Sequence, residues 1–324
     1  MSRNNILSQP FFRAFILGLL IVTPALLSAQ NRSLPILEEN PDARSMAMGN
    51  VSLMSTDRNY LYVNPSSIFY SANKYSVSVN GTFFPKNDDD VSGRLLYGNA
   101  SAAWRFADRH AAFIGYRYLG GETITGVKDQ YNTPGDEIKP LDWSFDFGYS
   151  FKINEKLSAF ARGSIIQQKF EESNNAFSFS LGGNYRTSLN LGSMESQLNI
   201  AARVLDLGPA IESSSEIKYD LPTSAQASAD LSLPLSDMNE LNIAVGGRYF
   251  LPSDATLLTV GAGAEYTYNN LVSARAGYNY GENETSRTTV GFGLNINFLS
   301  VDAAYSIAND TDFNMFHMGL TARF

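Results

Sequence analysis

The residues that could carry out chemistry are few in this chain. The sequence contains no Cys and two His, which excludes disulfides and thiolate metal sites. His110 falls in a predicted short turn, and His317 falls on the polar face of the last predicted strand. Neither has a Ser and a carboxylate arranged around it in the sequence as a hydrolase triad requires. We therefore expect no catalytic residue, no metal site and no cofactor, and the chain is not predicted to be an enzyme.

Two groups of carboxylates have the residue type of a calcium site or of a proton-sharing pair. Asp88, Asp89 and Asp90 form a run that lacks the turn glycine and the distal bidentate Glu of a calcium loop, so a solvated loop tip is expected. Asp142 and Asp146 lie on one face of a predicted strand, roughly 13–14 Å apart by strand rise. That separation is too large for a shared proton, and we expect both to be part of a polar lining.

The composition favours a β-rich chain. Its 324 residues include 12% aromatic residues and 25 Gly, which fits strands joined by many tight turns. The net charge of −8 argues against a nucleic-acid partner, because phosphate contacts require a basic surface.

Residues 1–29 have the pattern of a secretory signal peptide. Arg3 and Arg13 precede or flank an apolar run over 14–27, and small residues lead up to Ala29, the predicted cleavage site. The alternative is a membrane anchor, but the run is shorter than the roughly 20 residues that a spanning helix needs. If the mature protein is in a membrane, it must therefore be a closed barrel.

The segment 140–151 shows the clearest strand pattern. One parity holds Leu141, Trp143, Phe145, Phe147, Tyr149 and Phe151, and the other holds Asp142, Ser144, Asp146, Gly148 and Ser150. Because alternate side chains of a strand point to opposite faces, one face is apolar and aromatic while the other is polar.

The same alternation recurs along the chain. Strands are predicted at 74–84, 93–106, 111–120, 140–151, 156–169, 175–187, 194–206, 222–233, 240–251, 256–268, 271–281, 286–298, 300–308 and 313–324. Their connections alternate between long, as at 121–139 and 207–221, and short, as at 269–270. Outer-membrane barrels show this asymmetry. A secreted β-sandwich or a propeller would also alternate, but it would have to cover the aromatic face a second time. We therefore predict an all-β fold, a 14-stranded antiparallel transmembrane β-barrel.

The stretch 34–70 is the long segment of the mature chain that lacks a period of two. It is rich in Met, Asn and Pro, and we predict that it forms an N-terminal plug inside the barrel. The predicted division is a signal peptide at 1–29, a plug segment at 30–72 and a barrel at 73–324.

Two short motifs in this stretch carry a family resemblance. Asp42, Ala43 and Arg44 are followed by Met48-Gly49, and Asn64-Pro65 comes about 15 residues later. Together with the 219–223 segment and the terminal Phe, they resemble the PorV/PorQ family of outer-membrane proteins. The resemblance implies a fourteen-stranded barrel with a plug that serves the type IX secretion system. Such members bind cargo C-terminal domains, translocon subunits or attachment-complex subunits through extracellular loops. More distant relatives import hydrophobic molecules.

The end of the chain resembles the signal that the barrel assembly machinery recognises. Phe316, Met318, Leu320 and the terminal Phe324 share one parity. With the signal peptide, this pattern predicts the outer membrane of a Gram-negative bacterium as the location and its lipid as the surroundings.

Roles inside the plug were predicted from residue type. Arg44 and Asp42 were expected to pair with lumen groups such as Asp142 or Arg162, and Asn64-Pro65 was expected to form a turn into the first strand. Three methionines could either line a hydrophobic path or pack the plug against the wall; they are Met46, Met48 and Met54.

Two functions are expected. The first is an accessory barrel of type IX secretion that binds cargo or attachment partners. The alternative is a channel for hydrophobic small molecules, with such a ligand in the lumen.

Overall fold

The computed structural model describes residues 34–85, 93–127, 134–170, 173–192, 194–212, 218–251, 258–281, 286–309 and 313–324. The predicted signal peptide at 1–29, the first residues of the predicted plug at 30–33 and the acidic run Asp88–Asp90 lie outside the described residues.

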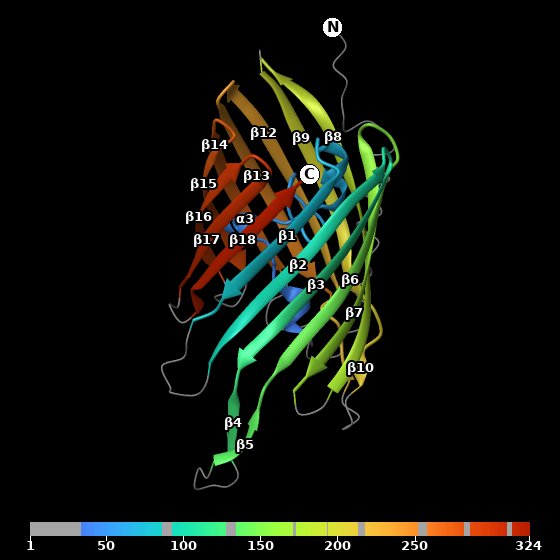
Figure 1. The fold of residues 1–324 in the computed structure, drawn as a ribbon, viewed down its shortest axis with the longest axis vertical. Helices are drawn as coiled ribbons and strands as arrows, with labels where there is room; N and C mark the ends of the chain where they lie inside the picture. Colours follow the sequence, from blue (N-terminus) through green and yellow to red (C-terminus); the bar gives the residue numbers. More distant parts are fainter. Residues whose placement is uncertain are drawn as a thin grey trace.

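Within the described residues, fourteen antiparallel strands form a closed barrel (Figure 1). They are β1 (Tyr75–Phe83), β2 (Gly93–Ala107), β3 (His110–Glu122), β6 (Leu141–Lys152), β7 (Leu157–Lys169), β8 (Ser173–Leu191), β9 (Met194–Leu207), β12 (Ser224–Ser236), β13 (Asn239–Phe250), β14 (Leu258–Tyr268), β15 (Val272–Gly281), β16 (Arg287–Ile296), β17 (Leu299–Ala308) and β18 (Met315–Arg323). The last strand, β18, pairs with the first, β1, so the sheet has no free edge. The predicted fold class and strand number are confirmed.

The strands differ from the prediction at a few places. The connection predicted at 121–139 contains a hairpin of β4 (Ile124–Val127) and β5 (Pro134–Ile138), and the connection at 207–221 contains β10 (Ile211–Glu212) and β11 (Lys218–Tyr219). Strand β8 runs past the predicted end at 187, because its pairing with β9 continues to Leu191 and the turn comes at Gly192, whose φ is +67°.

The two ends of the barrel carry different connections. Short turns join β2 to β3, β6 to β7 and β16 to β17 at the end where the C-terminus lies, whereas the β4–β5 hairpin projects from the opposite end (Figure 1). Asn269 and Asn270 both have φ of +52° in the turn between β14 and β15, a conformation that Asn tolerates well. We call the end with the short turns the short-turn end and the other the hairpin end.

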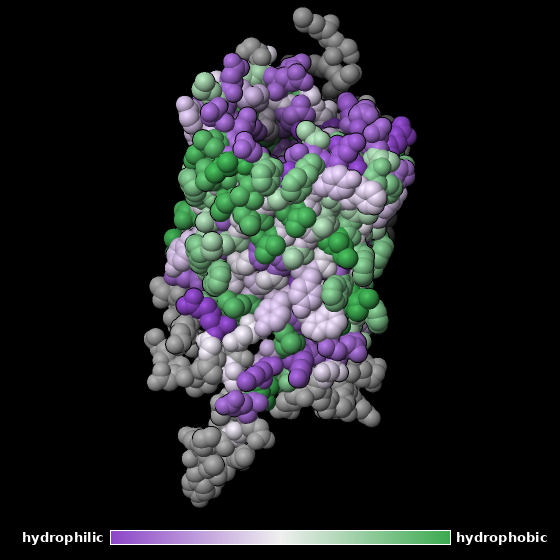
Figure 2. All heavy atoms as spheres, viewed as in Figure 1, coloured by the Kyte–Doolittle hydropathy of each residue, from purple (hydrophilic) through white to green (hydrophobic). Residues whose placement is uncertain are grey.

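The outer face of the wall is apolar and the inner face is polar. On β6, Asp142, Ser144 and Asp146 are buried toward the lumen, while Phe145 and Phe147 are 44% and 50% exposed on the outside. Figure 2 shows the resulting apolar band between two more polar ends. A closed sheet with an apolar outer band has the surface that a lipid bilayer requires.

Replacing an outward aromatic residue near the middle of a strand tests this assignment. In a bilayer we expect Phe147→Arg to lower the free energy of unfolding by about 2–4 kcal/mol, because the guanidinium would lie in hydrocarbon. Phe106→Arg, beside the β2–β3 turn, should cost about 0–1 kcal/mol. Equilibrium denaturation in lipid vesicles measures both variants, and equal costs would contradict a lipid-facing band.

Residues 34–70, which we call the interior segment, lie inside the barrel. The segment contains α2 (Pro35–Glu38), α3 (Ala43–Ala47) and the 3-10 helix η2 (Pro65–Tyr70). Helix α3 packs against β16, β17 and β18, behind the strands in the foreground of Figure 1. No helix in the part of the chain that the structure describes has the length and apolar character to cross a membrane.

Candidate functional site

Inward-facing glycines of the wall receive the end of helix α3. The glycine seat consists of Gly261, Gly263, Gly277 and Gly291, on β14, β15 and β16. Backbone of residues 48 and 49 lies directly against the first three, and the Ala47 methyl group lies against Gly291. A Cβ on Gly263 would lie 2.5 Å from the carbonyl oxygen of Met48, so no side chain fits there. Gly49 itself has φ of +71° and donates its N–H to Thr289 Oγ1 at 3.0 Å.

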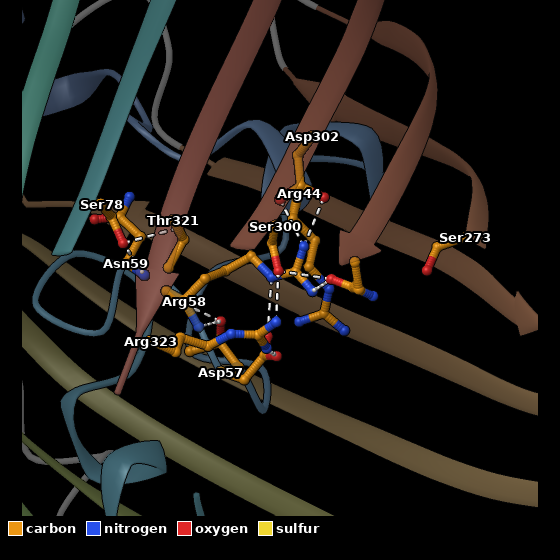
Figure 3. A network of polar contacts seen from close by, with 12 residues as sticks. Arg44, Asp57, Arg58, Asn59, Ser78, Ser273, Ser300, Asp302, Thr321 and Arg323 are labelled. Atoms are coloured by element: carbon orange, nitrogen blue, oxygen red, sulfur yellow. Dashed lines mark hydrogen bonds and ion pairs between the residues drawn. The ribbon is translucent and has the colours of Figure 1, made fainter. Parts of the chain in front are cut away.

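A network of buried ion pairs fixes the interior segment to the same wall. Arg44 contacts Glu265 through two hydrogen bonds, at 2.5 and 2.9 Å, and Arg275 pairs with Glu265 and with Asp302. Arg58 donates to both oxygens of Asp302 at 2.6 and 2.7 Å. Figure 3 shows Arg44, Arg58 and Asp302 converging between the interior segment and the strands. Such charge-assisted bonds are stronger than neutral ones.

The charge state of the two interior-segment arginines follows from these contacts. Burial by itself would lower the pKa of Arg44 and that of Arg58. The carboxylates of Glu265 and Asp302 outweigh burial, and both pKa values are raised above the usual arginine value. Both groups therefore remain charged at any physiological pH.

Arg44 pairs with a carboxylate of the lumen, as predicted, but the named partners Asp142 and Arg162 were wrong, and so was a basic partner for Asp42. Arg44 pairs with Glu265 rather than Asp142, and Arg162 pairs with Asp206 at 2.9 Å. Asp42 is the N-cap of α3 and accepts from the N–H and the hydroxyl of Ser45. The physical reason is position, because α3 lies on β16 to β18, about half the circumference away from β6 and β7 in the strand order.

Arginines of the opposite wall hold carbonyl groups of the interior segment. Arg117 donates to the carbonyl of Ile36 at 3.2 Å, and Arg248 donates to the carbonyl of Glu38 at 2.9 Å. Arg203 donates to the carbonyl of Tyr62 at 3.1 Å. Together with Arg162 and Asp206, these groups surround a small cavity of about 50 Å³ beside α2.

Asp146 organises this wall. It accepts from Arg117 at 2.6 Å, from Ser164 at 2.5 Å and from the phenol of Tyr62 at 2.7 Å. Asp142, its neighbour on the same face, is buried on the lumen side, as the sequence predicted for both.

The lumen contains a packed cluster of buried apolar side chains between this arginine layer and the hairpin end, which we call the apolar chamber. Buried wall residues and residues of the interior segment meet there. They are Tyr97, Leu119, Ile166 and Ala176 from the wall, Leu34, Ile36 and Leu37 from the interior segment, and Ile211 and Leu221 from the connection between β9 and β12, with Phe84 and Leu95 packed against them. The sequence analysis missed this chamber. Its signal was present as apolar residues on the otherwise polar parity, such as Ile166 on β7.

The remaining predicted plug residues have packing or capping roles in the structure. Ala43 and Met46 are buried in α3, and Met46 clusters with Ala47, Ala304 and Met315. Met48 and Met54 cluster with Val51, Val63 and Ala244. Of the two alternatives for the methionines, the structure places them in contacts with the wall, outside the apolar chamber.

Asn64 and Pro65 begin the 3-10 helix η2. The Asn64 side chain accepts from the N–H of Ser66 and donates to Asn184 of β8 at 2.8 Å. The predicted turn is therefore a helix cap. In both, the Asn side chain accepts a hydrogen bond from a backbone N–H two residues later, but here a 3-10 helix follows.

Both histidines are accounted for by neighbouring side chains. His317 is buried on the lumen side, where Nδ1 pairs with the Thr82 hydroxyl and Nε2 with the Ser306 hydroxyl. His110 lies at the start of β3 and pairs with the Tyr149 phenol at 2.5 Å.

The predicted assembly-signal residues lie on the outside of the last strand. Phe316, Met318 and Leu320 are exposed on β18, and Phe324 stacks on Phe298 with ring centroids 5.7 Å apart. The backbone N–H of Phe324 donates to Tyr75 at 2.8 Å. The residues thus belong to the strand that closes the barrel, and the signal itself stays a prediction.

The short-turn end of the lumen holds a polar cavity of about 270 Å³. Arg44, Asp57 and Arg58 of the interior segment line one side, and strand residues such as Arg186 and Glu240 line the other. This polar cavity and the apolar chamber thus lie toward opposite ends of the lumen.

Comparisons with known proteins identify the fold. No protein-family model and no curated protein matches the sequence. Among solved structures, the toluene transporter TbuX of Ralstonia pickettii is similar over 87% of this chain and 98% of its own, with a TM-score of 0.55 and 14% identity. The CymD monoaromatic hydrocarbon channel covers 90% and 99%, with a TM-score of 0.57 and 14% identity. A Pseudomonas aeruginosa FadL homologue covers 93% and 100%, with a TM-score of 0.50 and 14% identity. The chain has the barrel fold of these FadL-like proteins.

Proposed function

We propose that the chain is an outer-membrane channel for hydrophobic small molecules, with the interior segment as its plug. The observation that carries this proposal is the apolar chamber. At the hairpin end of the lumen, Tyr97, Leu119 and Ile166 turn apolar surface inward, and apolar side chains of the interior segment cover it. An apolar recess with a few polar groups beside it is the usual form of a small-molecule site.

The fold and surface support this proposal. The neighbours in fold include a protein named as a toluene transporter and one named as a monoaromatic hydrocarbon channel. The apolar outer band and the unequal connections fit an outer-membrane position, with the hairpin end outside the cell.

A ligand in the chamber would compete with helix α2. Leu34, Ile36 and Leu37 fill the chamber, and Arg117 and Arg248 hold α2 by its carbonyl groups. Ligand binding would therefore replace apolar contacts of α2 with contacts of the ligand. Because both sets of contacts are apolar, the exchange requires little net loss of burial.

Two adjacent isoleucines of β7 provide a matched test. Ile166 is fully buried in the chamber, whereas Ile165 is 43% exposed on the outer face. We expect Ile166→Asn to reduce uptake of labelled toluene, or of a labelled long-chain carboxylic acid, by about tenfold or more, since a polar group would enter an apolar site. Ile165→Asn should leave uptake of either probe within about twofold of the wild-type rate. Equal effects of the two substitutions on uptake would contradict a ligand site in the chamber.

The type IX secretion role stays a prediction from the motifs at 42–49 and 64–65. No comparison supports it, and these motifs already have capping and packing contacts in the interior segment. Affinity capture from detergent extracts of the native host tests it. Recovery of translocon subunits or cargo C-terminal domains, with no uptake of either labelled probe, would favour secretion over the channel.

A further inference from the structure

Three consecutive residues of the interior segment bridge the place where the barrel closes. We call Asp57, Arg58 and Asn59 the seam clasp, and the pairing of β1 with β18 the seam. Asp57 forms an ion pair with Arg323 of β18, and the backbone N–H of Asn59 donates to Ser78 Oγ of β1 at 2.9 Å. Figure 3 shows these side chains gathered at the seam.

The clasp also reaches the strands on both sides of the seam. Ser101 of β2 donates to Asn59 Oδ1 at 3.0 Å. Arg58 binds Asp302 of β17 and donates to Asn295 of β16 at 3.2 Å. Clasp residues therefore contact β2, β1, β18, β17 and β16, which are consecutive in the strand order.

Side chains of the wall continue the clasp across the seam. Ser78 of β1 and Thr321 of β18 share a hydrogen bond of 2.9 Å. Arg323 donates to Ser300 of β17 at 2.7 Å. The hydroxyl of Ser78 thus links Asn59 of the clasp to Thr321 of the last strand. Removal of the Ser78 or the Thr321 hydroxyl would leave a buried polar group without a hydrogen-bond partner.

The position of the clasp in the sequence gives it a role in closure. Ser78 and Thr321 are 243 positions apart, so pairing them in the unfolded chain is opposed by loop-closure entropy. The clasp lies only a short stretch before β1 and carries groups that bind β18 and β17. Once the interior segment is inside, these groups hold the last strands beside the first.

We infer that the seam clasp couples docking of the interior segment to closure of the barrel, so that both form and open as one unit. The partner of the clasp is the chain's own last strand. This inference does not depend on the proposed channel, because it concerns the wall and not the apolar chamber.

Engineered cysteines test the inference directly, because the native chain has no Cys. Val79 and Leu320 lie opposite each other across the seam, and both face outward. Val260 and Tyr280 form an equivalent outward pair between β14 and β15. Refolded protein in detergent carries one Cys pair at a time. It is oxidised briefly at increasing urea concentrations, and the disulfide yield reports whether that strand pair is closed.

The clasp variants are Asp57→Asn and Arg323→Gln. With either, we expect the seam pair to lose its disulfide yield at clearly lower urea than the β14–β15 pair, while in the wild type both pairs lose it together. The double variant should show less than the sum of the two single effects, because both substitutions remove the same ion pair, while each also removes one further bond, to Ser300 or to Arg58. Equal urea profiles for the two Cys pairs in the clasp variants would overturn the inference.

Two further variants separate a clasp from a general anchor. Asn64→Ala removes the bond to Asn184 on β8, far from the seam, and it should shift both urea profiles equally. A selective loss at the seam in this variant would overturn the inference. Arg323→Lys keeps the charge but not the two separate guanidinium nitrogens that bind Asp57 and Ser300, so it should show a smaller selective loss. It serves as the clasp variant if the others yield no folded barrel.

Discussion

Gly263→Val is expected to release the end of helix α3 from the glycine seat, while the seam clasp stays docked and the barrel stays closed. The Cβ of residue 263 would lie 2.5 Å from the Met48 carbonyl oxygen and 2.6 Å from its carbonyl carbon and Cα. These are backbone atoms, which cannot rotate out of the way. Overpacking typically costs about 1–3 kcal/mol. A cost of this size would raise the population in which the end of α3 is released, relative to the docked population, by about 5- to 150-fold. The barrel itself should tolerate Val, which suits a strand.

Single-channel recording in planar bilayers measures this change. We expect Gly263→Val to show frequent ion-conducting openings that the wild type shows rarely, because the lumen beyond the segment is polar. The matched control is Gly163→Val on β7, where a Cβ would meet no atom within 4 Å. Matching conductance in the two variants would show that the glycine seat does not hold the segment.

Glu265→Gln is expected to have the largest effect on stability. Glu265 accepts from Arg44 and from Arg275, and all three side chains are buried. The substitution preserves shape but leaves three guanidinium groups, those of Arg44, Arg58 and Arg275, near the one remaining buried carboxylate of Asp302. Breaking a buried ion pair in this way typically costs about 3–5 kcal/mol.

Denaturation in lipid vesicles gives the free energy of unfolding for this variant. Glu195→Gln is the control with the same chemical change, because Glu195 is exposed near the β8–β9 turn. Its effect should stay within about 0.5 kcal/mol. A cost below about 1 kcal/mol for Glu265→Gln would mean that solvent compensates the arginines and that the network is weaker than the burial indicates.

The wall was predictable from the sequence because strand parity is a local property. Each residue of 140–151 shows its face through its immediate neighbours, and the tight turns show where a strand reverses. Prediction failed where an outcome depends on strands far apart in the chain. Arg44 and Glu265 are 221 positions apart, and both Glu265 and Asp142 lie on polar faces. Which of these two carboxylates lies beside Arg44 depends on the order of the strands around the closed barrel.

The apolar chamber was missed for a related reason. Ile166 follows Ser164 and Arg162 on the same inward face of β7, which also holds Phe160, so the local pattern shows isolated apolar residues among polar ones. A single residue of this kind does not predict a cluster. It becomes part of a chamber once Leu119 and Tyr97 arrive from β3 and β2 and Leu34 arrives from the interior segment.

The glycine seat has a consequence for how related proteins are to be recognised. At Gly261, Gly263 and Gly277 the contact runs from backbone to backbone, so these positions must lack a side chain while the identity of the facing residue stays open. The positions of the glycine seat occur at intervals, with Gly261 and Gly263 on one strand and Gly277 and Gly291 on the next two. A contiguous motif cannot represent them. Chains that share this architecture can therefore diverge until ordinary alignment fails, and a search for inward glycines spaced across successive strands should recover them.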